Sequence, residues 1–224
     1  RSGIQSRHVP SIRLRPLAEA PPWGVAAWLV WGLVLAAAYY ASGMLGLAMP
    51  QIGQQVSLIW PPAGLAFAAL VRLGPRLWPA VLLGALPVAL STGLPLWAAS
   101  LLAIGNAAAP ALAAEGLRRH GLHPQLDRRH DLRLLALASA AAPVLTATNG
   151  VCWLVISGAM PWASAPLAWA YWWLGDLIGI LVFAPVFLTW RQSLLIGRRI
   201  WRLGEVTARL APLHRAIGAQ DADL

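Results

Sequence analysis

The arginines of this chain divide it into alternating basic and apolar stretches. The chain has no lysine, so all 17 of its basic residues are arginines. They form four groups: Arg1 to Arg15, Arg72 and Arg76, Arg118 to Arg133, and Arg191 to Arg215. Between successive groups lie two apolar stretches joined by a turn without arginine. Because arginine-rich loops stay on the cytoplasmic side of a membrane, this pattern predicts six spans with both termini in the cytoplasm.

The composition agrees with a membrane protein. Hydrophobic residues make up 58% of the chain and charged residues only 11%, whereas a soluble domain carries about 25% charged residues. The apolar residues also occur in long runs rather than in alternation. We therefore predict an all-α fold, an integral membrane bundle of about six transmembrane helices. The net charge of +9 is explained by the cytoplasmic arginines, so nucleic acid is not an expected partner.

The apolar stretches set the expected elements and domains. The expected spans are residues 25–47, 57–72, 77–92, 95–116, 132–158 and 165–190. The domains that follow are a basic cytoplasmic tail (1–24), a six-span membrane domain (25–190) and a cytoplasmic amphipathic tail or linker to an output domain (191–224). That last segment fits either an interfacial helix or a short coiled-coil seam. The chain begins with Arg rather than Met, so we expect a fragment of a longer protein or a trimmed start.

Asp176 is the carboxylate that interrupts the last apolar stretch. An ionisable side chain is costly inside a bilayer, so such a residue is by default a functional site that faces the bundle interior or a water-filled cavity. A second interpretation is a helix N-cap, because Gly175 precedes it and the segment WAYWW could be an interfacial aromatic belt. The sequence leaves both interpretations open.

Several polar residues share the depth of Asp176 in the membrane. At 1.5 Å per helical residue, Asp176 lies about 22 Å from the arginine that ends its stretch, and Trp60 lies about 18 Å from its own. By the same count Asn106 lies about 18 Å and Asn149 about 24 Å from the cytoplasmic end. All four fall in the outer half of a hydrocarbon core of about 30 Å. Taken together they predict an outward-facing pocket for a cationic or hydrogen-bonding ligand, or a proton. Either asparagine alone could instead make a helix–helix hydrogen bond.

Other chemistry is sparse in the sequence. His120, His123 and His130 lie in an arginine-rich loop without a cysteine partner, so a solvated loop is expected rather than a metal site. Cys152 is expected to be a small core residue. No phosphate-binding loop, nucleophile elbow or kinase signature occurs. We therefore expect no catalytic residue, no metal and no cofactor, and the chain itself is not expected to be an enzyme. A histidine kinase or diguanylate cyclase domain could belong to a longer parent protein.

Two segments resemble a known family. SLIWPPAGLAFAALVRLGPRLWPAVLLGA and WWLGDLIGILVFAPVFLTW are similar to the bacterial membrane-associated sensor domain of the first type. In that family an IWPPAG-like entry into one span and a GD-x-x-G-x-L-x-x-x-P stretch in a later span recur. The intervening HDLRLLALASAAAPVLTATNGV resembles the middle segment of the family, and the likeness covers roughly residues 25 to 190. The matching positions are Trp60, Pro61, Pro62, Ala63, Gly64, Gly175, Asp176, Gly179 and Pro185.

The resemblance implies a sensory input module of the bacterial inner (plasma) membrane that takes part in signal transduction, as in two-component systems. The family is usually described with eight spans, whereas this chain has six. Expected partners are the lipid bilayer, a second copy in a homodimer, a cytoplasmic output domain in cis or in trans, and an unidentified small ligand. The candidate ligand-binding or signalling residues are Asp176, Gly175, Gly179, Trp60, Pro61, Pro62, Gly64, Asn106, Asn149 and Trp173.

An alternative function comes from a different class of protein. A substrate-binding membrane component of a transporter can also be a six-span bundle of this size. Co-purification with an ATPase and a coupling subunit would favour the transporter, whereas a kinase or cyclase domain downstream in the same gene would exclude it. A membrane enzyme that uses Asp176 is the weakest alternative, because no second acid or nucleophile lies at its depth.

Overall fold

The structure, a computed structural model, describes residues 25–48, 51–52, 56–57 and 59–189. The two predicted tails, 1–24 and 191–224, lie outside the described residues. The helices are α1 (Val25–Ala48), α2 (Pro61–Leu73), α3 (Trp78–Ser91), α4 (Leu96–Arg119), α5 (Arg129–Ile156) and a last described helix over residues 165–189. The minor elements are the paired strands β1 (Gln51–Ile52) and β2 (Val56–Ser57) and the 3₁₀ turns η1 (Pro75–Leu77) and η2 (Trp162–Ser164).

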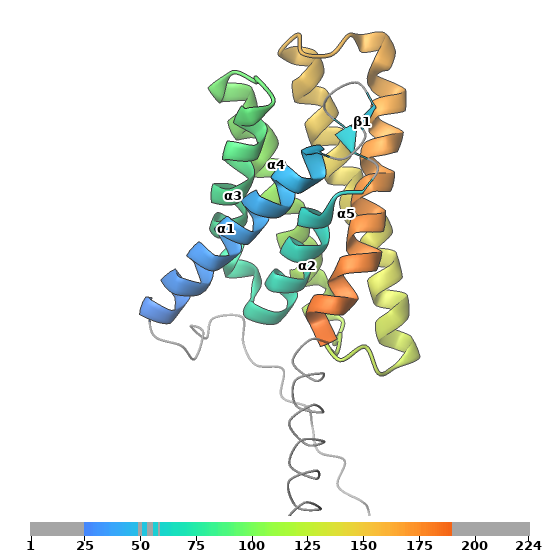
Figure 1. Cartoon of the computed structure of the whole chain (residues 1–224). Coiled ribbons are helices and arrows are strands. Elements are labelled where there is room, and N and C mark those ends of the chain that lie inside the picture. The colour runs from blue at the N-terminus through green and yellow to red at the C-terminus, as the bar shows by residue number, and fades with distance from the viewer. Residues whose placement is uncertain (1–24, 49–50, 53–55, 58, 190–224) are drawn as a thin grey trace, which may run out of the picture.

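The helices form one bundle with α4 at its centre. Helix α4 packs against α2, α3 and α5, and α1 packs against α2 and α3 (Figure 1). The turn after α3 and the connection after α5 lie at the upper end in this view, and η1 and the α4–α5 connection lie at the lower end. Successive helices therefore alternate in direction along the bundle.

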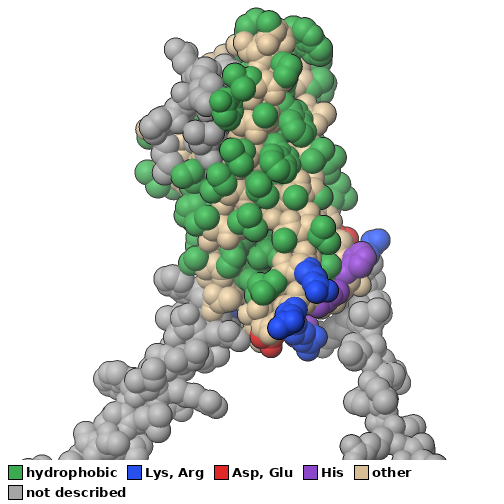
Figure 2. Space-filling view, turned by 90° about the vertical axis from the view of Figure 1, so that its right-hand side faces the viewer, with side chains coloured by type: hydrophobic (Ala, Val, Ile, Leu, Met, Phe, Trp, Pro, Cys, Tyr) green, Lys and Arg blue, Asp and Glu red, His purple; other side chains and the backbone are tan. Residues whose placement is uncertain are grey.

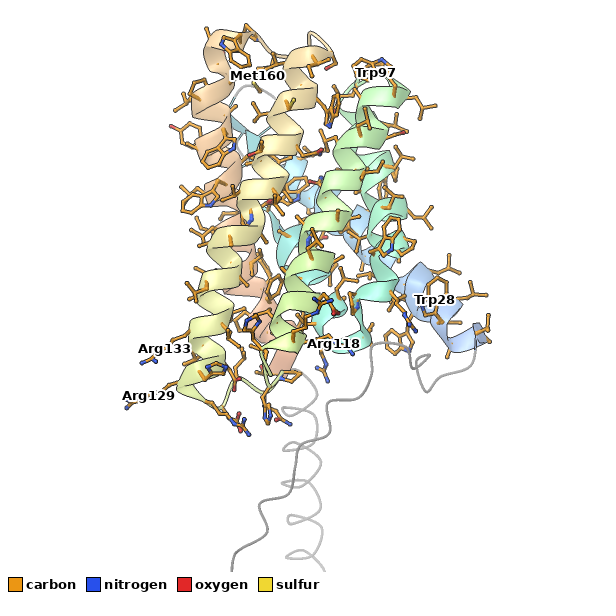
Figure 3. All side chains as sticks on the ribbon, turned by 180° about the vertical axis from the view of Figure 1, so that it is seen from behind. Trp28, Trp97, Arg118, Arg129, Arg133 and Met160 are labelled. Carbon is orange, nitrogen blue, oxygen red and sulfur yellow. The ribbon has the colours of Figure 1, made fainter. Side chains whose placement is uncertain are left out.

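Charged side chains gather at the lower end of the bundle. Figure 2 shows hydrophobic side chains over most of one face, with Arg, His and acidic side chains grouped at its lower end. From the opposite side, Arg118, Arg129 and Arg133 lie at this end, and Trp97 and Met160 lie at the other (Figure 3). The arginine-rich loops of the sequence therefore meet at one end of the folded bundle.

The helical fold class is confirmed, and each predicted apolar stretch contains a helix. Among the described residues, four helical segments are long and apolar enough to cross a membrane: α1, α4, α5 and Trp162–Thr189. Helices α2 and α3 have only 13 and 14 residues, which is about 20 Å each. The helix of the second stretch begins late because Trp60 precedes Pro61, and a residue before proline is driven out of the helical conformation.

Small residues let the helices approach closely at the centre of the bundle. The face of α4 that is buried consists mostly of alanines, as the small-residue composition of this stretch predicts. Alanines of α4 join one cluster with Phe67 and Leu70 of α2 and with Ile180 and Leu188 of the 165–189 helix. The same cluster contains Tyr39 and Ala85, which also line the cavity described below.

One residue lies elsewhere than the sequence predicts, and one carboxylate has a structural role that the sequence does not show. Cys152 is exposed on the outside of α5, so its prediction as a core residue was wrong. Asp131, in the first turn of α5, is fully buried and accepts a hydrogen bond from the backbone N–H of His123 at 3.0 Å. A carboxylate in the first turn of a helix also meets the positive end of the helix dipole. Asp131 therefore fastens the α4–α5 connection against the start of α5.

Candidate functional site

Asp176 lies in the middle of the 165–189 helix, not at its start. The helix-cap interpretation is therefore wrong, because the backbone N–H groups around Asp176 already have helical partners. Its side chain is only 3% exposed. One carboxylate oxygen, Oδ2, accepts a hydrogen bond from the Thr146 hydroxyl of α5. The other, Oδ1, is buried and has no hydrogen-bond partner among the described residues.

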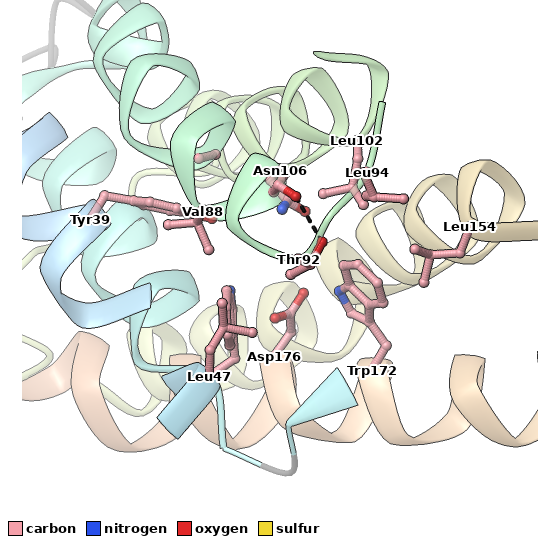
Figure 4. A pocket seen from close by; sticks show the side chains of 13 residues that line it. Tyr39, Leu47, Val88, Thr92, Leu94, Leu102, Asn106, Leu154, Trp172 and Asp176 are labelled. Atoms are coloured by element: carbon pink, nitrogen blue, oxygen red, sulfur yellow. Dashed lines mark hydrogen bonds between the residues drawn. The ribbon is translucent and has the colours of Figure 1, made fainter. Parts of the chain in front are cut away.

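A cavity of about 50 Å³ opens beside this carboxylate (Figure 4). That volume holds a few water molecules. Asp176 and Trp172 project into it from the 165–189 helix toward Asn106 of α4 and Thr92, which follows α3. The cavity is lined by Tyr39, Leu47, Trp60, Ala85, Val88, Ala89, Thr92, Leu94, Leu102, Asn106, Leu154, Trp172 and Asp176. Its wall is thus apolar and aromatic, with a few polar groups, as is typical of small-molecule sites.

A second, smaller cavity of about 20 Å³ is lined by some of the same residues. It shares Tyr39, Trp60, Asn106 and Asp176 with the first. Its remaining lining includes Pro110 of α4, Pro143 of α5 and Thr146. Asp176 therefore lies at the junction of two cavities in the core of the bundle.

The segment around Trp60 is held against the 165–189 helix through its backbone. The Trp60 backbone N–H donates to the Gly175 carbonyl at 3.2 Å. A Cβ atom on Gly179 would collide with the Trp60 carbonyl oxygen, and one on Gly64 would collide with the Gly179 carbonyl oxygen. Only glycine permits this approach of two backbones. The non-helical backbone at Trp60 is thus satisfied by protein, as membrane-embedded segments require.

Two further glycines make room for the tryptophans of the cavity. A Cβ atom on Gly46 of α1 would lie 2.9 Å from the Trp60 indole ring. A Cβ atom on Gly150 of α5 would collide with the Trp172 indole ring. The six-membered ring of each tryptophan therefore contacts a neighbouring helix where that helix has a glycine.

Pro61 and Pro62 determine where α2 begins. They occupy the first turn of the helix, where proline is favoured because the backbone N–H groups there have no helical acceptor. Pro62 is almost completely buried. The WPPAG sequence therefore positions the tryptophan and starts the helix; of its residues, Trp60 and Ala63 line the cavities.

The two asparagines predicted at one depth have different roles. The Asn149 amide nitrogen donates to the Leu101 and Leu102 carbonyls at 3.1 and 3.3 Å, and its oxygen accepts from the Trp153 indole. Asn149 therefore makes a helix–helix hydrogen bond between α5 and α4. It lines neither of the two cavities that Asp176 lines. Asn106 lines both.

Trp173 also lies apart from the cavity, because its indole N–H donates to the Ala140 carbonyl at 2.8 Å. Its neighbour Trp172 lines the cavity instead. Sequence reasoning missed Thr146 and Trp172 as site residues. The signals were present: Thr146 is a polar residue at a similar depth, and Trp172 lies one helical turn before Asp176.

The described residues contain no group of three or more His, Cys, Asp or Glu side chains able to hold a metal ion. In the α4–α5 connection, the His130 ring nitrogen Nε2 lies 3.2 Å from the His120 carbonyl oxygen. The two cavities beside Asp176 therefore present one carboxylate, hydroxyl and amide groups, and aromatic rings.

The fold and the cavity define a helical integral membrane protein with an internal polar site. A comparison with protein-family models matches residues 31–214 to the family MASE1. The chain therefore belongs to the MASE1 family, the membrane-associated sensor domains of the first type, as the WPPAG and GD-x-x-G segments predict. No curated protein and no solved structure matches the chain. Its role is thus that of an integral membrane sensory domain.

Proposed function

We propose that the chain is a multi-pass sensory input module of the bacterial inner membrane that detects its stimulus at the Asp176 cavity. The observation that carries this proposal is the buried Asp176 Oδ1 atom, which has no hydrogen-bond partner among the described residues. A ligand shifts a two-state equilibrium only by its differential affinity for the two states. In the state with this cavity, a ligand that donates to Oδ1 removes the cost of a missing hydrogen bond. The ligand therefore has a higher affinity for this state than for a state without the cavity.

Transmission to the cytoplasm runs along α2 and the 165–189 helix. Near the cavity, the Trp60 N–H donates to the Gly175 carbonyl. At the other end of α2, Arg72 donates to the carbonyls of Phe187 and Leu188 at 3.1 and 3.0 Å. These two attachments support a rigid pair of helices that carries a change at the cavity toward residue 190. The output domain, a histidine kinase or a diguanylate cyclase in cis or in trans, performs the catalysis, and this chain performs none.

The proposed topology has six crossings with the arginine-rich end in the cytoplasm, which brings both termini there. If the short helices α2 and α3 did not cross the membrane, η1 would lie on the outer side of the membrane. In a Cys152→Ala background, we therefore expect Ser91→Cys to react with a membrane-impermeant maleimide in intact cells. Arg76→Cys should react only after the cells are permeabilised. Labelling of Arg76→Cys in intact cells would contradict six crossings and support four.

The function is tested by substituting Asp176 in the full chain joined after Leu224 to a cyclase or kinase reporter. Asp176→Asn keeps the shape of the side chain and removes its charge. We expect about a tenfold change in the basal output, because one charge-assisted hydrogen bond is worth about 1.5–3 kcal/mol. The matched control is Asp127→Asn in the exposed α4–α5 connection, which should leave output unchanged. Equal output from Asp176→Asn and the original chain, at equal expression, would contradict the proposal.

A further inference from the structure

The Asp176 carboxylate has no positive partner among the described side chains. The described arginines and histidines lie in α2, in η1, in the α4–α5 connection, or in the ends of α4 and α5 that join it. These are the positions at the lower end of the bundle (Figures 2 and 3). An isolated buried carboxylate is costly, so a buried carboxyl group in a protein is paired, bound to a cation or protonated. A partner for Oδ1 must therefore come from outside this part of the chain.

The cavity beside Asp176 presents further oxygen atoms from other elements. The Thr92 hydroxyl donates its hydrogen to the Ala89 carbonyl at 2.7 Å, so its lone pairs are left to accept. The Asn106 side chain and the Tyr39 hydroxyl come from α4 and α1. In addition, Pro110 has no backbone N–H, so the Asn106 carbonyl lacks its ordinary helical donor. The polar lining thus supplies acceptor oxygens from three further elements, beside the N–H donors of Asn106, Trp60 and Trp172.

Aromatic rings complete the lining. Tyr39, Trp60 and Trp172 line the same cavity. The faces of aromatic rings attract cations, and cages of aromatic side chains recognise ammonium ligands. An anion would meet the Asp176 carboxylate without a compensating positive side chain. The lining therefore favours a positively charged occupant.

Charge and volume restrict this occupant further. Asp176 supplies a single negative charge, and no cluster of acids, cysteines or histidines accompanies it in the described part of the chain. The site can therefore neutralise an occupant with one positive charge. The cavity of about 50 Å³ is roughly a third of the ~150 Å³ that accommodates benzene. Only an ion or a molecule of very few heavy atoms fits.

We propose that the cavity beside Asp176 binds a small monovalent cation, coordinated by Asp176 Oδ1 and by oxygens of Thr92, Asn106 and Tyr39 under the rings of Trp60 and Trp172. This inference deepens the proposed function and rests on it for the biological meaning of the site. An alkali metal ion and a small ammonium ion share this chemistry, and they are separated by experiment. Binding would satisfy the unpartnered oxygen and join α1, α4 and the 165–189 helix.

The test measures the unfolding temperature of the full chain in detergent by tryptophan fluorescence. The background salt is N-methylglucamine chloride, whose cation is too large for the cavity. Sodium, potassium, ammonium, methylammonium and tetramethylammonium chlorides are then titrated separately. At saturation, at least one of the first four should raise the unfolding temperature by about 5 °C. Tetramethylammonium should have no effect, and the identity of the active salt distinguishes an alkali ion from an ammonium ion.

Two variants assign the shift to this cavity. Asp176→Asn should abolish it. Thr92→Val, which keeps the carboxylate and the side-chain shape, should weaken the apparent affinity about tenfold, so the test survives if Asp176→Asn does not fold. The proposal is overturned if no small cation stabilises the original chain, if tetramethylammonium acts equally well, or if Thr92→Val and Asp176→Asn respond like the original chain.

The cation site and the sensory role of the cavity can be contradicted independently of each other. Stabilisation by a small cation without any effect of that cation on reporter output would leave the cation site standing and contradict its sensory role. A change of output in Asp176→Asn without stabilisation by any small cation would support the sensory role and reject this ligand class.

Discussion

Replacing Gly179 with Ala is expected to lower the free energy of unfolding by about 3 kcal/mol, the upper part of the range for overpacked cores. The added Cβ would collide with the Trp60 carbonyl oxygen and lie 2.9 Å from its carbonyl carbon. A backbone group cannot rotate away as the end of a side chain can, so the whole start of α2 must move. That movement would also break the hydrogen bond from the Trp60 N–H to Gly175. Unfolding by denaturant in detergent, followed by tryptophan fluorescence, measures the loss.

Gly64→Ala should behave like Gly179→Ala, because its Cβ would collide with the Gly179 carbonyl oxygen and lie 2.7 Å from the Phe183 Cβ. The matched control is Gly116→Ala in α4, where no atom lies within 4 Å of the added Cβ. Since alanine is the better helix former, this control should be neutral or more stable by up to about 1 kcal/mol. Equal stabilities for Gly179→Ala and Gly116→Ala would show that the two backbones do not touch.

Replacing Arg72 with Ala is expected to change the output of the reporter fusion by about tenfold while the cavity stays intact. The Arg72 guanidinium donates to the Phe187 and Leu188 carbonyls and ties the end of α2 to the end of the 165–189 helix. A hydrogen bond from a charged donor is worth about 1.5–3 kcal/mol. Its loss frees the last described turn from α2. Reporter output is measured with and without Asp176→Asn, and the two substitutions should not add, because both act on one helix pair.

Arg119→Ala is the control for Arg72→Ala. Arg119 is also a basic residue at the end of a helix, but it pairs with Glu115 one turn away at 2.7 Å, and such exposed pairs contribute only about 0.3–0.5 kcal/mol. It should leave reporter output unchanged. Equal effects of Arg72→Ala and Arg119→Ala would mean that overall charge at this end matters and that the α2 attachment does not.

Much of the fold follows from the sequence alone because the signals are local. Apolar runs, arginine groups and prolines act on the residues that carry them, so the stretches predicted as 95–116 and 165–190 correspond to helices Leu96–Arg119 and 165–189. The start of α2 was less well predicted. Residues 57–60 are apolar enough for a span, but Pro61 prevents the preceding residue from being helical.

The candidate site was predicted in part, and the residues that were misplaced have one physical cause. Depth depends on position along the chain at 1.5 Å per residue, so counting along the helices brought Asp176, Trp60 and Asn106 to one level. All three line one cavity. The direction in which a side chain points changes by about 100° from one helical residue to the next. In a mostly apolar helix, the sequence gives little indication of which side faces the interior of the bundle. Trp173 was therefore chosen where Trp172 lines the cavity, and Asn149 was grouped with Asn106 although it bonds to α4.

The sequence by itself determined that this chain is a helical membrane protein, where its helices lie, and that a carboxylate is buried among them. The tertiary structure alone decided that Asp176 accepts a hydrogen bond from Thr146 through one oxygen and lines a cavity. It also decided that Gly64 and Gly179 bring α2 against the 165–189 helix. The reason is that the cost of inserting a residue into a membrane depends on its own chemistry and depth. A cavity or a close backbone contact, in contrast, depends on the rotation of several helices about their axes and on the distances between them.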